Sequence, residues 1–308
     1  MSAPPEFERV AIIGAGLIGG SIALAARETG AAGEVALYDL DAAVRTRARA
    51  CGLGQVCDDV HAAVAGASLI ILAAPVGAMA DALESAAPNI APGAVITDVG
   101  SVKQAVVSAA AVQAPDHAYF VPGHPIAGTE FSGPEAAFST LFRGRWHILT
   151  PLDDPRLGYD EAVSRLEAFW RRLGADVERM EPARHDLVLA VTSHLPHLIA
   201  FNIVAMAEEL ESVTESEVVK YSASGFRDFT RIAASDPVMW RDVFLNNRGA
   251  VLEVLDRFSS DLASLRGAIE RGDGAALYNL FARARRMRRE VIEAGQDSAA
   301  PNWGRDKT

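Results

Sequence analysis

The sequence contains little cysteine and has an excess of acidic over basic residues. Cys51 and Cys57 are the only two cysteines among 308 residues, which excludes a disulfide framework and indicates a reducing compartment. A net charge of −11 argues against binding along the phosphate backbone of a nucleic acid. We therefore expect a cytoplasmic protein with no nucleic-acid partner.

The sequence also lacks a convincing signal peptide or membrane span. The longest apolar stretch, 10–26, contains four glycines, and Glu6 and Glu8 precede it against a single Arg9. A signal peptide begins with positive charge, and a transmembrane helix needs about 20 mostly apolar residues. Half of the residues are hydrophobic and 22% are charged, which is typical of a soluble globular protein with no membrane partner.

Up to residue 181, short apolar runs alternate with helical patterns. The run 69–72 is apolar throughout, as expected of a strand buried on both faces, and 21–28 and 160–173 have helical character. Strands separated by helices form βαβ units, so we predict a Rossmann-type, doubly wound, mostly parallel α/β sheet over 1–181. The predicted strands are 10–13, 34–38, 69–73, 94–98, 118–121, 146–149 and 176–179.

After Pro182 the pattern changes to helical spacing. One helical pattern places apolar residues at 251, 252, 255, 258, 262 and 265, and Gly272-Asp273-Gly274 separates it from the next. We predict an all-helical substrate and dimerisation domain over 182–294, because long amphipathic helices suit a dimer interface. The polar segment 295–308 is predicted to be a flexible tail.

A glycine motif follows the first predicted strand. Gly14, Gly16 and Gly19 stand between an apolar run and a helical pattern, which is the context that a dinucleotide-binding turn requires. Gly14 permits the tight turn, Gly16 lets the backbone approach a pyrophosphate, and Gly19 allows close packing of helix on strand. An ordinary βαβ turn is the alternative. Further predicted cofactor contacts are Leu17 and Ile18 within the motif and Pro75 after the strand 69–73.

Asp39 follows the next strand, twenty residues beyond Gly19. A carboxylate there accepts hydrogen bonds from the adenosine ribose and repels a 2′-phosphate, so the sequence predicts NAD rather than NADP. Arg45, six residues further on, is the feature that weakens this preference.

Two loops at strand ends carry residues suited to proton and hydride chemistry. Ser101, in the segment 97–103, either caps the next helix or points its hydroxyl at a reacting group. His124 stands between glycine and proline after another apolar strand, and we expect a rigid turn to hold it at the same edge of the sheet. Oxidation of an alcohol needs a proton acceptor, and the pKa of histidine suits that role. His61, His117 and His147 are interpreted as structural.

The helical region contains a third cluster of polar residues. Its histidines are His185 and the pair His194 and His197, and Arg231 within 226–231 could bind a carboxylate through two hydrogen bonds. The pair could in principle bind zinc, but no thiolate or carboxylate arrangement completes a site, so no metal is predicted. Trp240 either lines the same pocket or packs in the core.

These segments together resemble the prephenate and arogenate dehydrogenases of tyrosine biosynthesis. The matching segments occur in the family's order between Val10 and about Arg289. The glycine motif alone is shared with many families, whereas its combination with His-Pro-Ile-Ala-Gly-Thr-Glu, Ser-His-Leu-Pro-His and Asp-Phe-Thr-Arg-Ile-Ala is far more selective. The segments are 14–21, 98–103, 123–130, 193–197, 228–233 and 236–242.

The resemblance implies oxidative decarboxylation of a cyclohexadienol, giving 4-hydroxyphenylpyruvate from prephenate or tyrosine from arogenate. Hydride passes from the ring carbon to NAD, the ring carboxylate leaves as CO2, and aromatisation drives the reaction. By similarity, His124 takes the proton of the ring hydroxyl, Ser101 lies near it, and Arg231 binds a substrate carboxylate. The resemblance also implies a homodimer formed by the helical domain. The remaining residues matched to the substrate site are His185, Ser193, His197, Thr129 and, with no defined role, Glu130.

Two other functions stay open at this point. A β-hydroxyacid dehydrogenase or imine reductase also joins a Rossmann domain to helices, but hydroxyacid enzymes carry a lysine where Leu198 stands, four residues before Asn202. A non-enzymatic NAD-binding redox sensor would need no cluster of histidine and arginine. Prephenate and arogenate both stay open as substrates. No segment suggests a fused chorismate mutase or a regulatory ACT module, so we expect any feedback by tyrosine to act at the active site or interface.

Overall fold

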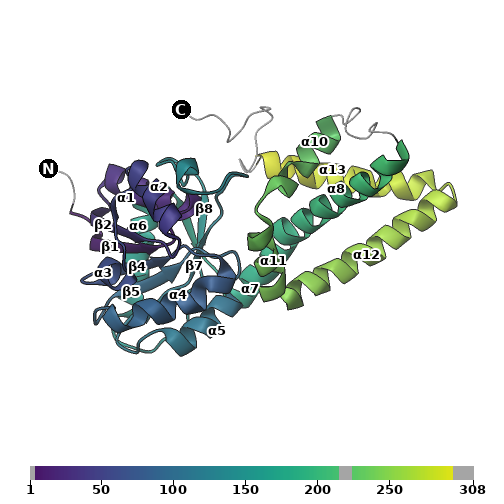
Figure 1. Ribbon diagram of the computed structural model, residues 1–308. Helices are drawn as coiled ribbons and strands as arrows, with labels where there is room; N and C mark the ends of the chain where they lie inside the picture. The colour runs from purple at the N-terminus through teal and green to yellow at the C-terminus, as the bar shows by residue number, and fades with distance from the viewer. Residues whose placement is uncertain (1–3, 215–223, 294–308) are drawn as a thin grey trace. The chain divides into compact units, whose positions relative to one another are not determined.

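The computed structural model describes residues 4–214 and 224–293, and the predicted tail 295–308 lies outside them. The chain forms two compact units, Met1–Val251 and Leu252–Thr308. The predicted fold class is confirmed, because a doubly wound α/β sheet forms early in the chain and the described residues from Pro182 onward form helices and the turns between them (Figure 1). The domain boundary predicted at 181/182 stays a prediction.

Six parallel strands form the main sheet, in the order β3-β2-β1-β4-β5-β6. The order reverses between β1 and β4, and ligands of open α/β sheets bind beyond the carboxyl ends of the strands at such a point. The short strand β3 was not predicted from the sequence. The strands are β1 (Phe7–Ile13), β2 (Ala32–Tyr38), β3 (Gln55–Val56), β4 (Leu69–Leu72), β5 (Val95–Asp98) and β6 (Tyr119–Phe120).

Helices cover both faces of this sheet, and successive residues of β1 show why. Val10 and Ile12 belong to a core shared with α1 and α6, whereas Ala11 and Ile13 belong to a second core shared with α3, α4 and α5. Side chains alternate across a strand, so a strand that is apolar throughout supplies both cores. The helices are α1 (Leu17–Thr29), α2 (Ala42–Ala50), α3 (Val60–Val64), α4 (Met79–Ala86), α5 (Gln104–Gln113) and α6 (Tyr159–Arg172), with short 3-10 turns η1 (Val76–Ala78), η2 (Ala87–Asn89) and η3 (Pro134–Ala136).

A second, three-stranded sheet follows β6, which corrects two expectations. Its strands are β7 (Gly123–Pro125), β8 (Trp146–Leu149) and β9 (Asp176–Arg179), with β7 antiparallel to β8. The strands at 146–149 and 176–179 therefore do not extend the main sheet. His124 lies in a strand rather than a turn, paired with Ile148. The main ladder ends after Val121, because the next N–H in register, that of Gly123, donates to the side chain of Asp98 instead of to the backbone of β5.

In the rest of the first unit, the described residues 182–214 and 224–251 form helices joined by short turns. Glu181 caps the start of this region, since its carboxylate accepts from the backbone N–H groups of Ala183 and Arg184. A turn of π-helix separates the first two helices, and such turns are frequent at functional sites. The elements are α7 (Pro182–Leu189), the π turn η4 (Ala190–His194), α8 (Leu195–Thr214), α10 (Ser224–Thr230), the 3-10 turn η5 (Arg231–Ala234) and α11 (Pro237–Asn246).

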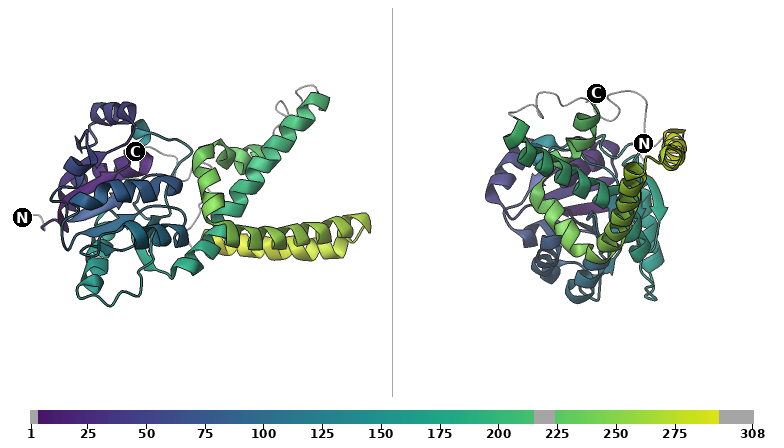
Figure 2. Two further views of the ribbon diagram at one scale, coloured as in Figure 1. Left: turned by 60° about the horizontal axis from the view of Figure 1, so that its bottom comes forward. Right: turned by 90° about the vertical axis from the view of Figure 1, so that its right-hand side faces the viewer.

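The long helices α12 (Arg248–Glu270) and α13 (Gly274–Glu293) make up most of the second unit. Figure 2 shows each of them as a continuous helix. The predicted interruption at 272–274 is confirmed, and Asp273 accepts a hydrogen bond of 3.0 Å from the N–H of Ala276. Large apolar side chains are exposed on both helices: Leu252, Leu262, Ile269, Tyr278, Phe281 and Met287.

One helical run among the described residues, Pro182–Glu209, is long and apolar enough to cross a membrane, contrary to the expectation from the sequence. Its first turns contain the buried side chains of His185, Asp186 and His194, which contact neighbouring protein elements rather than lipid. Core helices of globular proteins meet the same criterion of length and composition, so this run is weak evidence for a membrane span.

Candidate active site

The glycine turn joins β1 to α1 with no room for side chains at two positions. Gly14 has φ +111°, and a Cβ there would lie 2.4 Å from the carbonyl oxygen of Ala73. A Cβ on Gly19 would lie 1.9 Å from the carbonyl oxygen of Gly14, so this glycine sets the distance between helix and strand. A Cβ on Gly16 would meet no atom within 4 Å. The space beside Gly16 is therefore open, and no side chain caps the start of α1, which fits a dinucleotide pyrophosphate.

Asp39, at the carboxyl end of β2, is held beside this turn. Its Oδ2 accepts from the N–H of Ala15 at 2.9 Å, and its Oδ1 accepts from the N–H of Asp41 at 3.0 Å. Each carboxylate oxygen keeps a further lone pair for a ribose hydroxyl. Arg45 donates to the carbonyl oxygen of Asp39 at 2.7 Å and pairs with Asp58, so its charge is already compensated. The arrangement fits NAD better than a cofactor with a 2′-phosphate.

The other predicted cofactor residues follow the carboxyl ends of β1 and β4. Leu17 and Ile18 open α1, with the side chain of Leu17 in the core and its backbone at the phosphate-binding end. Pro75 is exposed just before η1, after β4. The contacts of these residues with the cofactor stay predictions.

Ser101 lies in the loop between β5 and α5, half-buried, and does not cap the helix. The cap comes instead from Asp186 in α7, whose carboxylate accepts from the N–H groups of Lys103 at 2.7 Å and Gln104 at 2.9 Å. The capping interpretation of Ser101 is therefore wrong, because a side chain distant in sequence performs that task. The loop itself is fixed by Asp98, whose Oδ2 accepts from the N–H of Gly100 at 2.8 Å.

His124 is 8% exposed on β7, and its Nδ1 lies 2.9 Å from Nε2 of His185. The two rings meet edge to face, with centroids 5.1 Å apart. Burial lowers the pKa of His124 well below 6.5, and the positive charge of Lys103 lowers it further. His124 is therefore a neutral imidazole at pH 7, the form that can accept a proton.

A buried ion pair fixes the backbone next to His124. Lys103 pairs with Asp98, both side chains being fully buried, and donates a hydrogen bond of 2.6 Å to the carbonyl oxygen of Gly123. Asp98 in turn accepts from the N–H of Gly123 at 3.2 Å. Both backbone groups of the residue before His124 are thereby bonded to one ion pair. Burial lowers the pKa of Lys103, an effect that Asp98 opposes.

The π turn and α11 bring a second group of aromatic rings to the Ser101 loop. Trp240 is 6% exposed, packs against Val102, and stacks on His197 with ring centroids 3.7 Å apart. His197 also contacts the carbonyl oxygen of Ser193 through Nδ1 at 2.8 Å. Trp240 therefore joins the loop after β5 to His197, one of the predicted substrate residues.

His194 is buried beside this group, with its ring centroid 6.1 Å from that of Trp240. Its Nδ1 lies 3.0 Å from the side-chain amide nitrogen of Asn247. Burial lowers the pKa of His194 to about 4, against the raising influence of Asp186. No group of three or more potential metal ligands occurs among the residues described by the structure.

Arg231, at the start of η5, lies at a partly exposed edge of the site. Its guanidinium is 3.3 Å from the carboxylate of Glu130, which lies in the segment after β7. Burial lowers the pKa of His197, and the charge of Arg231 also lowers it. Thr129 is engaged locally, because its hydroxyl accepts from the N–H of Phe131 at 3.2 Å.

The structure thus joins several predicted residues and adds some that the sequence did not suggest. His124 contacts His185, Arg231 contacts Glu130, and His197 reaches the Ser101 loop through Trp240. The additions are Asp98 and Lys103, which belong to a motif noticed for Ser101, and Asp186, whose neighbour His185 was its only signal.

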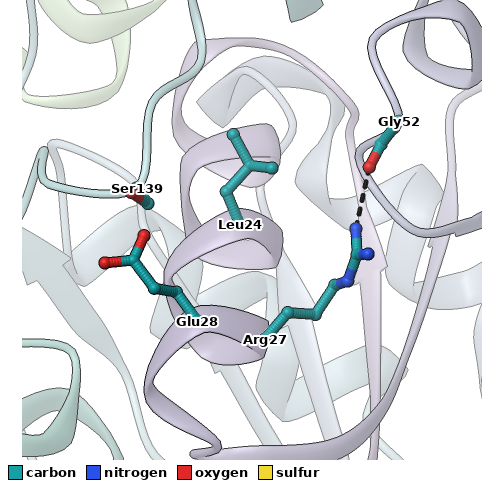
Figure 3. Close-up of a pocket in the computed structure, with 5 residues that line it drawn as sticks. All are labelled: Leu24, Arg27, Glu28, Gly52 and Ser139. Carbon is teal, nitrogen blue, oxygen red and sulfur yellow. Dashed lines mark hydrogen bonds between the residues drawn. The ribbon is translucent and has the colours of Figure 1, made fainter.

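A shallow surface pocket of about 490 Å³ lies elsewhere, along α1 (Figure 3). Arg27 donates a hydrogen bond of 2.8 Å to the carbonyl oxygen of Gly52 across it. None of its lining residues belongs to the predicted site; they are Leu24, Arg27, Glu28, Gly52 and Ser139.

Comparison with known families gives two consecutive matches. Residues 22–179 match the family model described as the nucleotide-binding domain of prephenate dehydrogenase. Residues 181–283 match the model described as the dimerization domain of prephenate dehydrogenase.

Individual relatives agree with these matches. The chain is 42% identical over 284 residues to a cyclohexadienyl dehydrogenase of Zymomonas mobilis, covering 92% of this chain and 95% of that one. It is 35% identical to a prephenate dehydrogenase of Bacillus subtilis, over 96% of this chain and 78% of that one. Among solved structures, a prephenate dehydrogenase from Aquifex aeolicus in complex with hydroxyphenyl propionate and NAD+ superposes with a TM-score of 0.83. The two sequences are 32% identical, and the superposition covers 92% of this chain and 98% of that one.

Proposed function

Because the chain belongs to the prephenate dehydrogenase family, its reaction is NAD-dependent oxidative decarboxylation in tyrosine biosynthesis, and we propose that His124 is the proton acceptor of that reaction. The observation that carries this proposal is the contact of His124 Nδ1 with His185. It leaves Nε2 of a neutral, nearly buried imidazole to receive a proton.

The proposed reaction begins with the ring hydroxyl of a cyclohexadienol next to His124. Its proton moves to Nε2 as hydride leaves the same carbon, with bound NAD supplying the hydride acceptor. The bond between ring and carboxylate breaks, its electrons complete the aromatic ring, and CO2 leaves. Ser101, in the neighbouring loop, donates a hydrogen bond to the reacting oxygen.

Arg231 is proposed to bind a carboxylate of the substrate, with His197 and Ser193 beside it. Arg231 already pairs with Glu130, and both side chains are partly exposed. Exposed ion pairs are weak, typically below about 1 kcal/mol, so a substrate carboxylate can replace Glu130 at little cost. We also propose that Thr129 and Glu130 lie at the entrance of the site.

We propose that the enzyme accepts prephenate, arogenate or both. The Zymomonas mobilis relative is a cyclohexadienyl dehydrogenase, and a Synechocystis structure named arogenate dehydrogenase superposes with a TM-score of 0.75 at 26% identity. The two substrates differ in their side chains, a ketone against an amino acid, and share the reacting ring.

A cytoplasmic homodimer is the proposed form of the enzyme. Residues 181–283 match a dimerization domain. Within Leu252–Thr308, exposed apolar side chains such as Leu262, Tyr278 and Phe281 would be covered by a second copy. The oligomeric state is measured by light scattering on the purified full chain.

The direct test is formation of NADH by the purified protein after addition of prephenate or of arogenate, each with NAD and with NADP. We expect turnover with NAD and at least one of the two acids. Absence of turnover with both acids and both cofactors would contradict the proposed function.

A further inference from the structure

Three buried side chains stand in series behind the proposed proton acceptor. His124 Nδ1 lies 2.9 Å from His185 Nε2, and His185 Nδ1 lies 2.9 Å from Oδ1 of Asp186. His185 and Asp186 are 0% and 1% exposed, so water does not replace these contacts. Both ring nitrogens of His185 are engaged, which leaves neither for the substrate contact predicted from the sequence.

The charge state of Asp186 determines which ring nitrogens of His185 and His124 carry a proton. Burial opposes its ionisation, but hydrogen bonds from His185 and from the backbone N–H groups of Gln104 and Lys103 outweigh burial and lower the pKa of the carboxyl group. An ionised carboxylate only accepts, so His185 Nδ1 carries a proton. Burial lowers the pKa of His185 despite Asp186, so its ring is neutral at pH 7 and Nε2 holds a lone pair. His124 Nδ1 must then donate its proton in the hydrogen bond to His185 Nε2. Because the His124 ring is neutral, its Nε2 is unprotonated.

Asp186 is also held by hydrogen bonds to groups outside this series. Its carboxylate accepts from the first N–H groups of α5, and its backbone oxygen accepts from the side-chain amide of Asn247 at 2.9 Å. Figure 1 shows α7 against α5, in agreement with the residue contacts between these helices. The start of a helix carries partial positive charge, which stabilises the carboxylate in its ionised form.

From these contacts we propose that His185 and Asp186 are positioning residues that hold His124 in the tautomer with an unprotonated Nε2. They also stabilise the imidazolium that forms on His124 during the reaction. This inference rests on the proposed role of His124 as proton acceptor. The proton from the ring hydroxyl ends on Nε2, while Nδ1 and His185 keep theirs and Asp186 stays ionised. The other titratable groups acting on His124 are Lys103, His147 and His194, and each opposes a positive charge on its ring.

The tautomer is measured without reference to activity, by ¹⁵N-edited NMR of the full-length unliganded protein at pH 7. The His124 signals are assigned by their loss in His124→Asn. We expect a protonated Nδ1 and an unprotonated Nε2 on His124, and a protonated Nδ1 on His185. A protonated Nε2 on His124 in the unsubstituted protein would overturn the proposal.

Two substitutions of His185 separate hydrogen bonding from simple space filling. In His185→Gln, the amide oxygen can accept from His124 and the amide nitrogen can donate to Asp186, so we expect kcat to stay within about 10-fold. In His185→Leu no acceptor remains, and we expect kcat to fall by about 100-fold or more, with KM changed by less than about 3-fold. Equal losses in the two variants, or a loss confined to KM, would contradict the positioning role.

Asp186→Asn tests the charge at the end of the series. An amide can still accept from α5, but loss of the negative charge destabilises the His124 imidazolium, so the acid limb of the pH profile of kcat/KM shifts to lower pH while kcat falls. Glu181→Ala is the matched control, because it removes the exposed cap of the same helix. The control should lower the melting temperature and leave kcat and the acid limb unchanged. An Asp186→Asn variant with only a lower melting temperature would show a structural role alone.

These results distinguish failure of this proposal from failure of the proposed function. If His124→Asn loses activity while His185→Leu keeps it, the positioning role is wrong and the proton acceptor stands. If His124→Asn keeps near-native turnover, the assignment of the acceptor fails whatever tautomer is measured.

Discussion

The ammonium group of Lys103 donates a hydrogen bond of 2.6 Å to the carbonyl oxygen of Gly123, the residue immediately before His124. Because Lys103 also pairs with Asp98 in a fully buried position, the backbone that carries the proposed proton acceptor is held by an ion pair inside the protein. Removal of one partner leaves the other charge buried without compensation.

Replacement of Lys103 by Met is therefore expected to destabilise the protein by about 3–5 kcal/mol in free energy of unfolding. The measurement is urea-induced unfolding followed by circular dichroism. The double variant Lys103→Met with Asp98→Asn removes both charges and should recover part of the loss. A single variant as stable as the original chain would contradict the importance of the pair.

Stability should fall as the pH drops below about 6.5, because several buried histidines are neutral in the folded state. Burial lowers the pKa of His124 and His147 well below 6.5 and that of His194 to about 4. The unfolded chain binds protons on these residues at a higher pH than the folded chain does. Their contribution is therefore fully present above pH 6.5 and is lost below it, at up to about 1.4 kcal/mol per pH unit for each residue.

His147 offers a matched variant for this pH dependence. It is fully buried, stacks on Trp170 with centroids 3.8 Å apart, and both of its ring nitrogens lack hydrogen-bond partners. His147→Phe keeps the stacked ring and removes one titrating group. At pH 7.5 the variant should be as stable as the original chain. Between pH 7.5 and pH 5.5 its urea midpoint should fall by less than that of the original chain. An unchanged pH slope would show that His147 does not contribute.

Cofactor preference should depend on Asp39. Replacement by Ser removes a charged acceptor that fits the ribose, and hydrogen bonds to charged groups contribute about 1.5–3 kcal/mol. We expect kcat/KM for NAD to fall by about 10–100-fold and the ratio of NAD to NADP activity to fall with it. Asp41→Ser, two residues away in the exposed cap of α2, is the control and should leave both values unchanged. An unaltered NAD preference in Asp39→Ser would contradict the assignment.

Substrate binding should depend on Arg231. Arg231→Gln removes the cation proposed to bind a substrate carboxylate, so KM for the ring acid should rise by about 10–100-fold and kcat should change much less. Arg266→Gln, at an exposed arginine paired with Glu270 on α12, is the control. Steady-state kinetics at fixed saturating NAD measure both constants. A selective loss of kcat would instead place Arg231 at the reacting ring.

The main sheet and the nucleotide turn could be predicted from the sequence because their signals are local. A continuous apolar run such as Leu69–Leu72 specifies a strand buried on both faces, and the spacing of Gly14, Gly16 and Gly19 specifies a turn with close backbone contacts. The interruption between α12 and α13 was equally visible, because glycine and aspartate end one helix and cap the next.

The arrangement around His124 could not be predicted in the same way. The strand Gly123–Pro125 has only three residues and forms through pairing with β8, so its sequence resembles a turn. Asp186 caps a helix whose first N–H groups lie 82 and 83 positions away in the chain, a distance at which no sequence pattern operates. The capping interpretation of Ser101 failed for the same reason.

The proposed NAD-dependent oxidative decarboxylation depends most directly on His124 as its proton acceptor. Its test is kcat for NADH formation from prephenate or arogenate by the unsubstituted chain and by His124→Asn, with the exposed His61→Asn as control. We predict that His124→Asn lowers kcat by about 10²–10⁴-fold, with KM within a few-fold, and that the control keeps full activity. Near-native kcat in His124→Asn would contradict the mechanism.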